Sequence, residues 1–229
     1  MRYIVAAIKI YNFLNFYELQ KKYTEHEFLL VKNKEELVDA LNSKFSPDYI
    51  FFPHWSWIIP KEIYDSFNCV VFHMTDLPFG RGGSPLQNLL VRGIYNTKIS
   101  AIKVQEGLDT GDIYMKEDFV IDKGNADEIL KAASDIVFKQ MIPKFIENQL
   151  SAVPQQGNVV NFKRRTPDQS EIPGGLNKRE LYDYIRMLDG EGYPVAYIQD
   201  KNKKIYFRNA QLTGDKLIAE VEIEVNSDE

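Results

Sequence analysis

A polar histidine, His73, ends a short apolar run within the segment VVFHMTDLPFGRGGSPLQNLL at residues 70–90. Histidine can take up and release a proton near neutral pH, because its unperturbed pKa is about 6.5. The run GRGGSP follows and leads directly into a predicted helix. Unpaired N–H groups at the start of a helix favour an anion or a carbonyl oxygen. A plain tight turn would explain these glycines but not Arg81 among them, so the segment indicates a ligand site.

A second polar cluster, EGLDTGD at residues 106–112, carries the carboxylates of Asp109 and Asp112. Taken alone, a solvated turn is the simpler explanation of this cluster. A lone histidine such as His73 is likewise more often a structural residue than a catalytic one. The meaning of both clusters therefore depends on the elements that position them.

Two short and almost uninterrupted apolar runs, DYIFFP at 48–53 and CVVF at 69–72, predict neighbouring strands. Such runs suit strands that are covered on both faces, as in a parallel sheet. His73 directly follows the second run. Because open α/β sheets bind ligands outside the carboxyl ends of their strands, we expect His73 to lie at a ligand crevice.

The remaining segments predict alternating strands and helices followed by a smaller region. Strands are predicted at 3–10, 98–104 and 112–121. Helices are predicted after the first of these strands, at 33–45, from Ser84 to Gly93, and from Asn125 onward with a kink or split at Pro143. After about residue 150 the chain becomes turn-rich, and a short helix and two or three antiparallel strands follow. We therefore expect an α/β fold, with a Rossmann-like, mostly parallel sheet and helices on both faces over residues 1–150. A small α+β appendage is expected over 151–229.

The composition is that of an ordinary soluble globular protein, with 44% hydrophobic and 27% charged residues among 229. The formal net charge of −5 argues against a nucleic-acid binder, although the basic runs at 163–165 and 201–204 leave a local patch open. Cys69 is the only cysteine, which excludes an internal disulfide and fits a reducing compartment. The N-terminal apolar run is too short for a membrane span and lacks a cleavage site. We therefore expect a cytoplasmic protein without a membrane partner or a bound metal.

Together, these segments resemble the folate-dependent formyltransferase family, to which the methionyl-tRNA formyltransferases belong. Members of that family have a strand ending in Asn-x-His, then Ser-Leu-Leu-Pro, Arg-Gly-x-x-Pro and a later Leu-Asp-x-Gly loop. The matching runs here are VFH at 71–73, MTDLP at 74–78, RGGSP at 81–85 and LDTG at 108–111. The interval from His73 to Asp109, 109 − 73 = 36 residues, is similar to the spacing in the family. The resemblance covers about residues 48–210.

The resemblance implies transfer of a formyl group from 10-formyltetrahydrofolate to a primary amine. It implies that His73 is the proton shuttle and that Asp109 orients and stabilises its imidazole. The residues that it places around the cofactor are Trp57, Ile58, Ile59, Arg81, Gly107 and Leu108. The residues that it places near the acceptor substrate are Thr75, Asp76, Gly82 and Gly83.

One position departs from the family pattern, because Val71 stands where the family has asparagine. Valine cannot donate a hydrogen bond to a developing oxyanion. Asn68 is a poor substitute, because it lies five residues before His73 and hence on the opposite face of the strand. His54 ends the preceding apolar run, so the two strand tips should share one crevice. We therefore predict His54 as the replacement donor and third catalytic residue, while a packing or capping role stays open.

The region after residue 160 is similar to enzymes that formylate amino sugars on nucleotide carriers. We therefore expect a nucleotide-linked amino sugar as substrate and partner, a role in polysaccharide biosynthesis and no nucleic-acid partner, with a homodimer left open. Alternatives are another amine, of an aminoacyl-tRNA or a purine precursor, and a non-catalytic folate- or nucleotide-binding protein. The acidic balance and the absence of a long basic C-terminal domain disfavour the tRNA alternative. Retention of both His73 and Asp109 favours an enzyme.

Overall fold

The computed structural model describes residues 1–225, which form two compact units. The first unit contains Met1–Arg81, Thr97–Phe119 and Lys131–Asn161. The second contains Gly82–Asn96, Val120–Leu130 and residues 162–225. Each unit is therefore built from segments that are distant from one another in the sequence.

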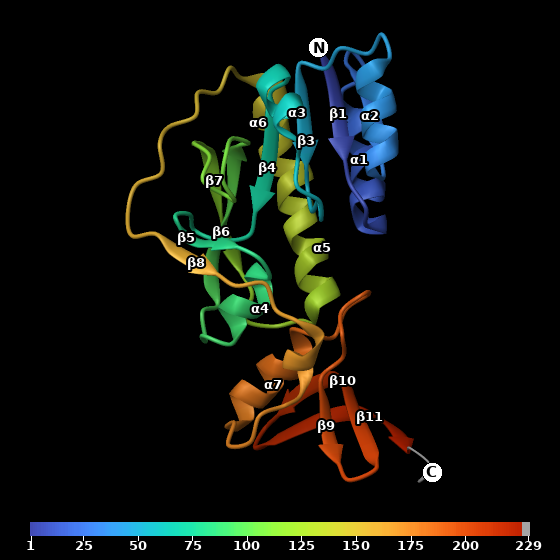
Figure 1. Ribbon diagram of the computed structural model, residues 1–229, viewed down its shortest axis with the longest axis vertical. Coiled ribbons are helices and arrows are strands. Elements are labelled where there is room, and N and C mark those ends of the chain that lie inside the picture. The colour runs from blue at the N-terminus through green and yellow to red at the C-terminus, as the bar shows by residue number, and fades with distance from the viewer. Residues whose placement is uncertain (226–229) are drawn as a thin grey trace. The chain divides into compact units, whose positions relative to one another are not determined.

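The first unit is built on a six-stranded sheet (Figure 1). Its strands, in spatial order, are β2 (Glu27–Val31), β1 (Arg2–Ala6), β3 (Tyr49–Phe52), β4 (Cys69–His73), β6 (Asn96–Lys103) and β7 (Ile113–Val120). The pairs from β2 to β4 are parallel, and β6 is antiparallel to β4. Ile50, Phe51 and Phe52 of β3 are fully buried, as the uninterrupted apolar run predicts for a strand covered on both faces.

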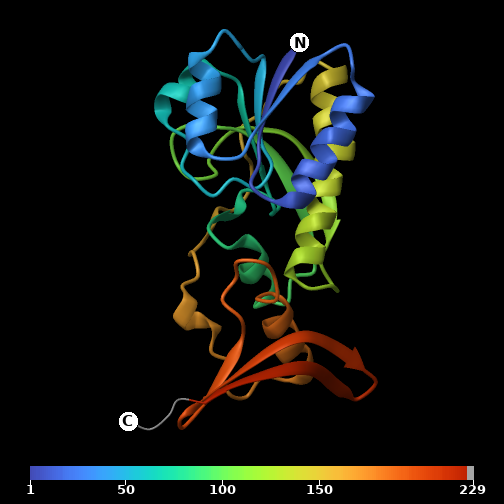
Figure 2. The same cartoon turned by 90° about the vertical axis from the view of Figure 1, so that its right-hand side faces the viewer.

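Helices cover both faces of this sheet (Figure 2). They are α1 (Ile10–Lys22), α2 (Lys34–Asn42), α3 (Lys61–Ser66), η1 (Val137–Met141) and α6 (Ile142–Glu147). Figure 2 shows α2 and α3 on one face and α1, η1 and α6 on the other. Leu37 of α2 and Ile63 of α3 pack in one apolar cluster with Ile50. Phe51, the next residue along β3, points to the opposite face, because successive side chains of a strand alternate. Its ring lies 5.3 Å from that of Phe145 in α6.

The helix predicted from Asn125 onward begins with the predicted capping box and is divided into segments, as also predicted. Oδ1 of Asn125 accepts from the Glu128 N–H, and Oε2 of Glu128 accepts from the Asn125 N–H, each at 3.0 Å. The helix α5 (Ala126–Ile136) follows, and the π-helical turn η1 separates it from α6. Pro143 explains this split, because proline lacks an N–H and its ring crowds the carbonyl group four residues earlier. Both features of the prediction are confirmed.

Besides the first residues of α5, the second unit contains further helical segments and an antiparallel sheet. They are α4 (Pro85–Leu90), η2 (Pro167–Ser170), α7 (Lys178–Arg186), and the strands β9 (Tyr197–Asp200), β10 (Lys203–Thr213) and β11 (Lys216–Val225). Arg186 is 1% exposed. Its guanidinium donates to Oδ1 of Asp183 at 2.6 Å and to the carbonyl oxygen of Ile121 at 2.7 Å. Because a buried charge must be paired, this network anchors α7 to the segment after β7.

The predicted fold class is confirmed, since a mostly parallel sheet with helices on both faces precedes a small antiparallel sheet. The sequence patterns do not predict β2, α3 or the two-stranded sheet of β5 (Phe79–Gly82) and β8 (Val160–Phe162). The assignment of a catalytic domain to 1–150 and a smaller domain to 151–229 stays a prediction. Within residues 1–225, every helix is too short or too polar to cross a bilayer.

Candidate functional site

The strands β3 and β4 bring two histidines to one edge of the sheet. Phe52 at the end of β3 lies opposite Val71 of β4 in the parallel register. His54 and His73 each follow these paired residues by two positions. Both histidines therefore lie at the carboxyl edge, where open α/β sheets bind ligands.

The loop between β6 and β7 turns sharply to bring Asp109 to His73. Lys103, the last residue of β6, pairs with a residue three positions before His73. Gly107 and Asp109 have positive φ angles of 94° and 52°. This conformation costs a non-glycine residue roughly 1–3 kcal/mol. A Cβ atom at Gly111 would lie 1.7 Å from the carbonyl oxygen of Lys103, so only glycine fits there.

His73 and Asp109 form a mostly buried pair. Nδ1 of His73 lies 3.5 Å from Oδ2 of Asp109, and the two side chains are 8% and 11% exposed. Nε2 of His73 lies 2.8 Å from the carbonyl oxygen of Gly80. A carbonyl oxygen only accepts hydrogen bonds, so Nε2 carries the hydrogen and donates it. The neutral ring therefore has its lone pair at Nδ1, beside Asp109, where it can accept a proton.

The side chain of Gln155 joins the Asp109 loop to Arg81. Its Nε2 donates to the carbonyl oxygens of Asp109, at 2.9 Å, and Gly111, at 2.8 Å. Its Oε1 accepts from Nε and Nη2 of Arg81, at 3.0 and 2.8 Å. The sequence offers no signal for these contacts, because Gln155 lies in a turn-rich segment 46 residues after Asp109. The structure thus adds a residue to the predicted site.

His54 combines an unusual backbone conformation with a neutral ring. It leaves β3 at a positive φ angle of 71°. Burial, and then the positive charge of Lys9, lower the pKa of His54 from 6.5 to about 4. At neutral pH the ring is therefore uncharged, with one N–H donor and one acceptor nitrogen.

Apolar side chains on the loops after β3 and β6 are open to solvent. Ile58 is 90% exposed and Leu108 is 65% exposed. Trp57 packs edge-on against Trp55, with ring centroids 4.7 Å apart. Ile59, in contrast, is buried in the core cluster. Exposed apolar groups of this kind fit a flat ring system such as the pterin of a folate.

Val71, at the position of the family asparagine, makes apolar contacts. It is partly buried and packs against the buried cluster of Leu77, Ile102 and Ile113. The position of the family asparagine is therefore occupied by a side chain without a hydrogen-bond donor, as the sequence shows.

Two predicted substrate residues, Thr75 and Asp76, already have partners within the protein. Thr75 is fully buried, and its hydroxyl donates to the carbonyl oxygen of Gly80 at 3.3 Å. Asp76 is exposed and forms an ion pair with Lys116. Contacts of these residues with a substrate stay predictions.

The other two predicted substrate residues, Gly82 and Gly83, belong to the second unit and allow close packing there. A Cβ atom at Gly82 would lie 2.3 Å from the carbonyl oxygen of Phe162. A Cβ atom at Gly83 would lie 2.6 Å from Cβ of Arg164. The glycines therefore have a packing reason of their own, beside their predicted substrate role.

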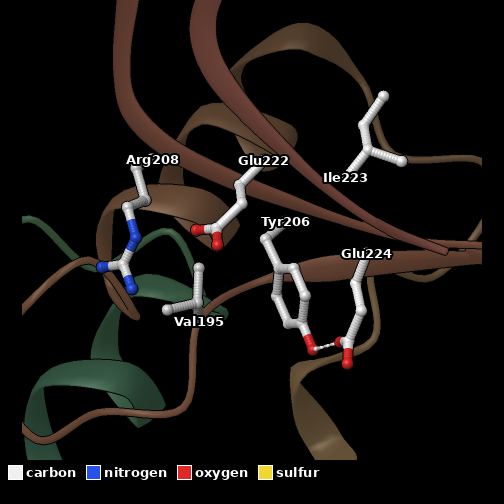
Figure 3. Close-up of a pocket in the computed structure, with 6 residues that line it drawn as sticks. All are labelled: Val195, Tyr206, Arg208, Glu222, Ile223 and Glu224. Atoms are coloured by element: carbon white, nitrogen blue, oxygen red, sulfur yellow. Dashed lines mark hydrogen bonds between the residues drawn. The ribbon is translucent and has the colours of Figure 1, made fainter.

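A hollow on the sheet of the second unit is a separate feature (Figure 3). Its lining residues are Val195, Tyr206, Arg208, Glu222, Ile223 and Glu224. The Tyr206 hydroxyl donates to Oε2 of Glu224 at 2.9 Å. None of the predicted site residues lines this hollow.

Two family models match the chain. Residues 17–146 match the formyl transferase model, and residues 167–224 match the model for the C-terminal domain of methionyl-tRNA formyltransferase. The first match alone covers more than half of the chain and contains His73 and Asp109.

Similar proteins belong to the same family as these models. The solved methionyl-tRNA formyltransferase from Clostridium thermocellum is 49% identical, with a TM-score of 0.92, over 99% of this chain and 100% of that one. The methionyl-tRNA formyltransferase of Syntrophomonas wolfei is 30% identical over 80% of this chain and 61% of that protein. The chain spans between half and two thirds of the length of the curated relatives it matches. A sugar N-formyltransferase from Shewanella has 14% identity and a TM-score of 0.67, over 93% of this chain and 99% of that one.

The predicted amino-sugar substrate is wrong, and so are the sugar-nucleotide partner and the exclusion of nucleic acid. The 49% identical relative is a methionyl-tRNA formyltransferase, whereas the 14% identity to the sugar enzyme shows a shared fold alone. A role in polysaccharide biosynthesis loses its basis with the sugar. The net charge of a whole chain is a poor guide to nucleic-acid binding, because phosphates interact with local clusters of cations.

The predicted family, in contrast, is confirmed. The motifs around His73 and Asp109, the fold and the family-model match over residues 17–146 agree. This chain belongs to the formyltransferase family.

Proposed function

We propose that this protein transfers a formyl group from 10-formyltetrahydrofolate to the amino group of methionyl-tRNA. The observation that carries the proposal is the 49% identity to a methionyl-tRNA formyltransferase over nearly the whole length of both chains. The formyl donor of this family is 10-formyltetrahydrofolate, which supplies an electrophilic formyl carbon when it is bound. A cytoplasmic location is part of the proposal, because aminoacyl-tRNA is made there.

His73 is proposed to manage the proton of the reaction. The attacking amine must lose a proton as its nitrogen bonds to the formyl carbon. Nδ1 of His73 has the lone pair that can take this proton, since Nε2 donates to Gly80. The protonated ring can then return the proton to the nitrogen that leaves the formyl group.

Asp109 is proposed to stabilise the protonated form of His73. Its carboxylate lies 3.5 Å from Nδ1, and both side chains are mostly shielded from water. Opposite charges attract more strongly in such a site than in bulk water, because the effective dielectric constant is lower. Asp109 also fixes the direction in which Nδ1 points.

The cofactor is proposed to lie against the loops after β3 and β6. Trp57, Ile58 and Leu108 offer apolar surface to its ring, while Ile59 and Gly107 shape the backbone behind them. Arg81 is held at its guanidinium by Gln155 and would present positive charge to the acidic part of a folate.

His54 is proposed as the donor that Val71 cannot be. Its ring is neutral at the pH of the reaction, so one nitrogen carries a hydrogen without carrying charge. It follows the strand β3, whose partner strand β4 ends in His73. A neutral donor at this edge can stabilise negative charge as it develops on the formyl oxygen.

The second unit contains an exposed basic cluster, Arg92, Lys163 and Arg164, that suits the phosphates of tRNA. All three residues are exposed, and none forms an ion pair within the described part of the chain. Asn88 fixes the backbone there, because its Nδ2 donates to the carbonyl oxygen of Lys163 at 3.0 Å. The Arg92 guanidinium lies 4.7 Å from the ring centre of Phe162. Unpaired cations on a fixed backbone favour a polyanion.

Replacing either member of the His73–Asp109 pair should remove most of the activity. His73→Asn and Asp109→Asn should each lower turnover by about 10²–10⁴-fold, the range expected for general acid–base catalysis. Formylation of methionyl-tRNA by purified protein is the measurement, and Asp112→Asn is the control with a small effect. Near wild-type turnover of His73→Asn would show that this histidine is structural.

Removing the ring of His54 should affect turnover and spare cofactor binding. His54→Ala should lower turnover by about 10²–10³-fold, as for the loss of one oxyanion donor. Because the ring is neutral, this ratio should stay constant between about pH 6 and 8. Calorimetry with 5-formyltetrahydrofolate should show unchanged affinity, and His26→Ala is the matched control. A loss of folate affinity with unchanged turnover would instead assign His54 to the cofactor pocket.

Neutralising the basic cluster should lower the affinity for tRNA and make that affinity less dependent on the salt concentration. Lys163→Gln with Arg164→Gln should raise the KM for methionyl-tRNA and reduce the salt slope by about 0.7–0.9 for each lost phosphate contact. The control is Lys203→Gln with Lys204→Gln, because this second basic run includes Lys204, which lies opposite Glu224 of β11. Equal effects of the two double variants would contradict a specific role of the cluster.

A further inference from the structure

The side chain of Gln155 links the loop of Asp109 to Arg81. Its Nε2 donates to two carbonyl oxygens of the loop, and its Oε1 accepts from two guanidinium nitrogens of Arg81. We propose that Gln155 is a positioning residue for formyl transfer, which holds the carboxylate of Asp109 in place against His73. This inference rests on the proposed function for its kinetic part alone.

The chemistry of these contacts selects an amide. The loop offers two carbonyl oxygens, which need donors, while Arg81 offers N–H groups, which need an acceptor. Glutamate provides the acceptor and no donor, and lysine provides donors and no acceptor. Glutamine therefore satisfies both neighbours at once, whereas a charged replacement satisfies one of them.

The contact falls at the point of the loop that most needs support. Asp109 has a φ angle of 52°, in the left-handed region, which aspartate visits more readily than most residues but at an energetic cost. Nε2 of Gln155 binds the carbonyl oxygen of Asp109 itself and that of Gly111 two residues later. The two bonds hold the backbone at Asp109 and directly after it, and so restrict where its carboxylate lies.

The chain around Gln155 is anchored independently of its side chain. Val153 exchanges two backbone hydrogen bonds with Ile113 of β7, at 2.8 and 2.9 Å. Gln156, the next residue, is exposed. Replacing the side chain of Gln155 therefore leaves the path of the chain in place, and Gln156 provides a control of the same residue type.

Three single variants of the whole protein test the inference: Gln155→Ala, Gln155→Glu and Gln156→Ala. The first readout is amide hydrogen exchange of peptides that cover 104–112, which needs neither substrate nor cofactor. The second readout is the kcat and KM for formylation of methionyl-tRNA. Gln155→Glu keeps the acceptor for Arg81 and loses both donors to the loop. It therefore distinguishes the effect of the loop contact from that of the Arg81 contact.

Gln155→Ala and Gln155→Glu should each exchange at least about tenfold faster over 104–112, because the loop loses both anchoring bonds. Their kcat should fall by about 10–100-fold, the effect of misplacing a catalytic group by about 1 Å. The KM for methionyl-tRNA should change less than about twofold, because the basic cluster is intact. Gln156→Ala should behave as the wild type in both readouts.

Unchanged exchange over 104–112 in Gln155→Ala would overturn the inference, and so would a wild-type kcat in Gln155→Glu. If the wild-type protein does not formylate methionyl-tRNA, the proposed function fails. The exchange data still decide whether Gln155 holds the loop in that case, so the two failures are distinguishable.

Discussion

The position of Asp109 is the constraint on which the candidate site depends. Its carboxylate lies 3.5 Å from His73, although the preceding strand β6 ends beside an earlier part of β4. The chain can return to His73 only through a tight loop, in which Gly107 and Asp109 have positive φ angles. Gly111 allows the close backbone approach that this turn requires. The hydrogen bonds of Gln155 hold the loop in this shape.

The parallel sheet supplies the other half of the site. Parallel strands place the residues that follow them at one edge, so His54 and His73 leave the sheet together. The same strands are buried on both faces, with Ile50 and Phe51 packed against opposite helix layers. A rigid sheet of this kind suits catalysis, because it holds the side chains at its edge in fixed positions.

Much of this arrangement can be predicted from the sequence. The apolar runs at 48–53 and 69–72 predict β3 and β4, and the Asn125–Glu128 pair predicts the start of α5. His73 and Asp109 follow from the motifs and are brought together in the structure. Gln155 could not be predicted, because a contact between two loops leaves no periodic pattern. The acceptor cannot be predicted from the motifs either, since they concern the proposed formyl-transfer site alone.

The proposed acceptor substrate illustrates the difference between net and local charge. The chain carries a formal charge of −5, yet Arg92, Lys163 and Arg164 are exposed cations without a carboxylate partner in the described part. The other basic run, at 201–204, includes Lys204, which lies opposite Glu224 of the neighbouring strand β11. Binding of a polyanion depends on such local clusters, so an acidic protein can still accept tRNA.

A direct comparison of acceptors tests the central claim. Purified protein would be incubated with 10-formyltetrahydrofolate and either methionyl-tRNA or a nucleotide-linked amino sugar, and the products would be analysed by mass spectrometry. The account predicts the mass of one added formyl group on the methionyl amine of the tRNA and none on the sugar. A formylated sugar nucleotide together with unmodified methionyl-tRNA would contradict it.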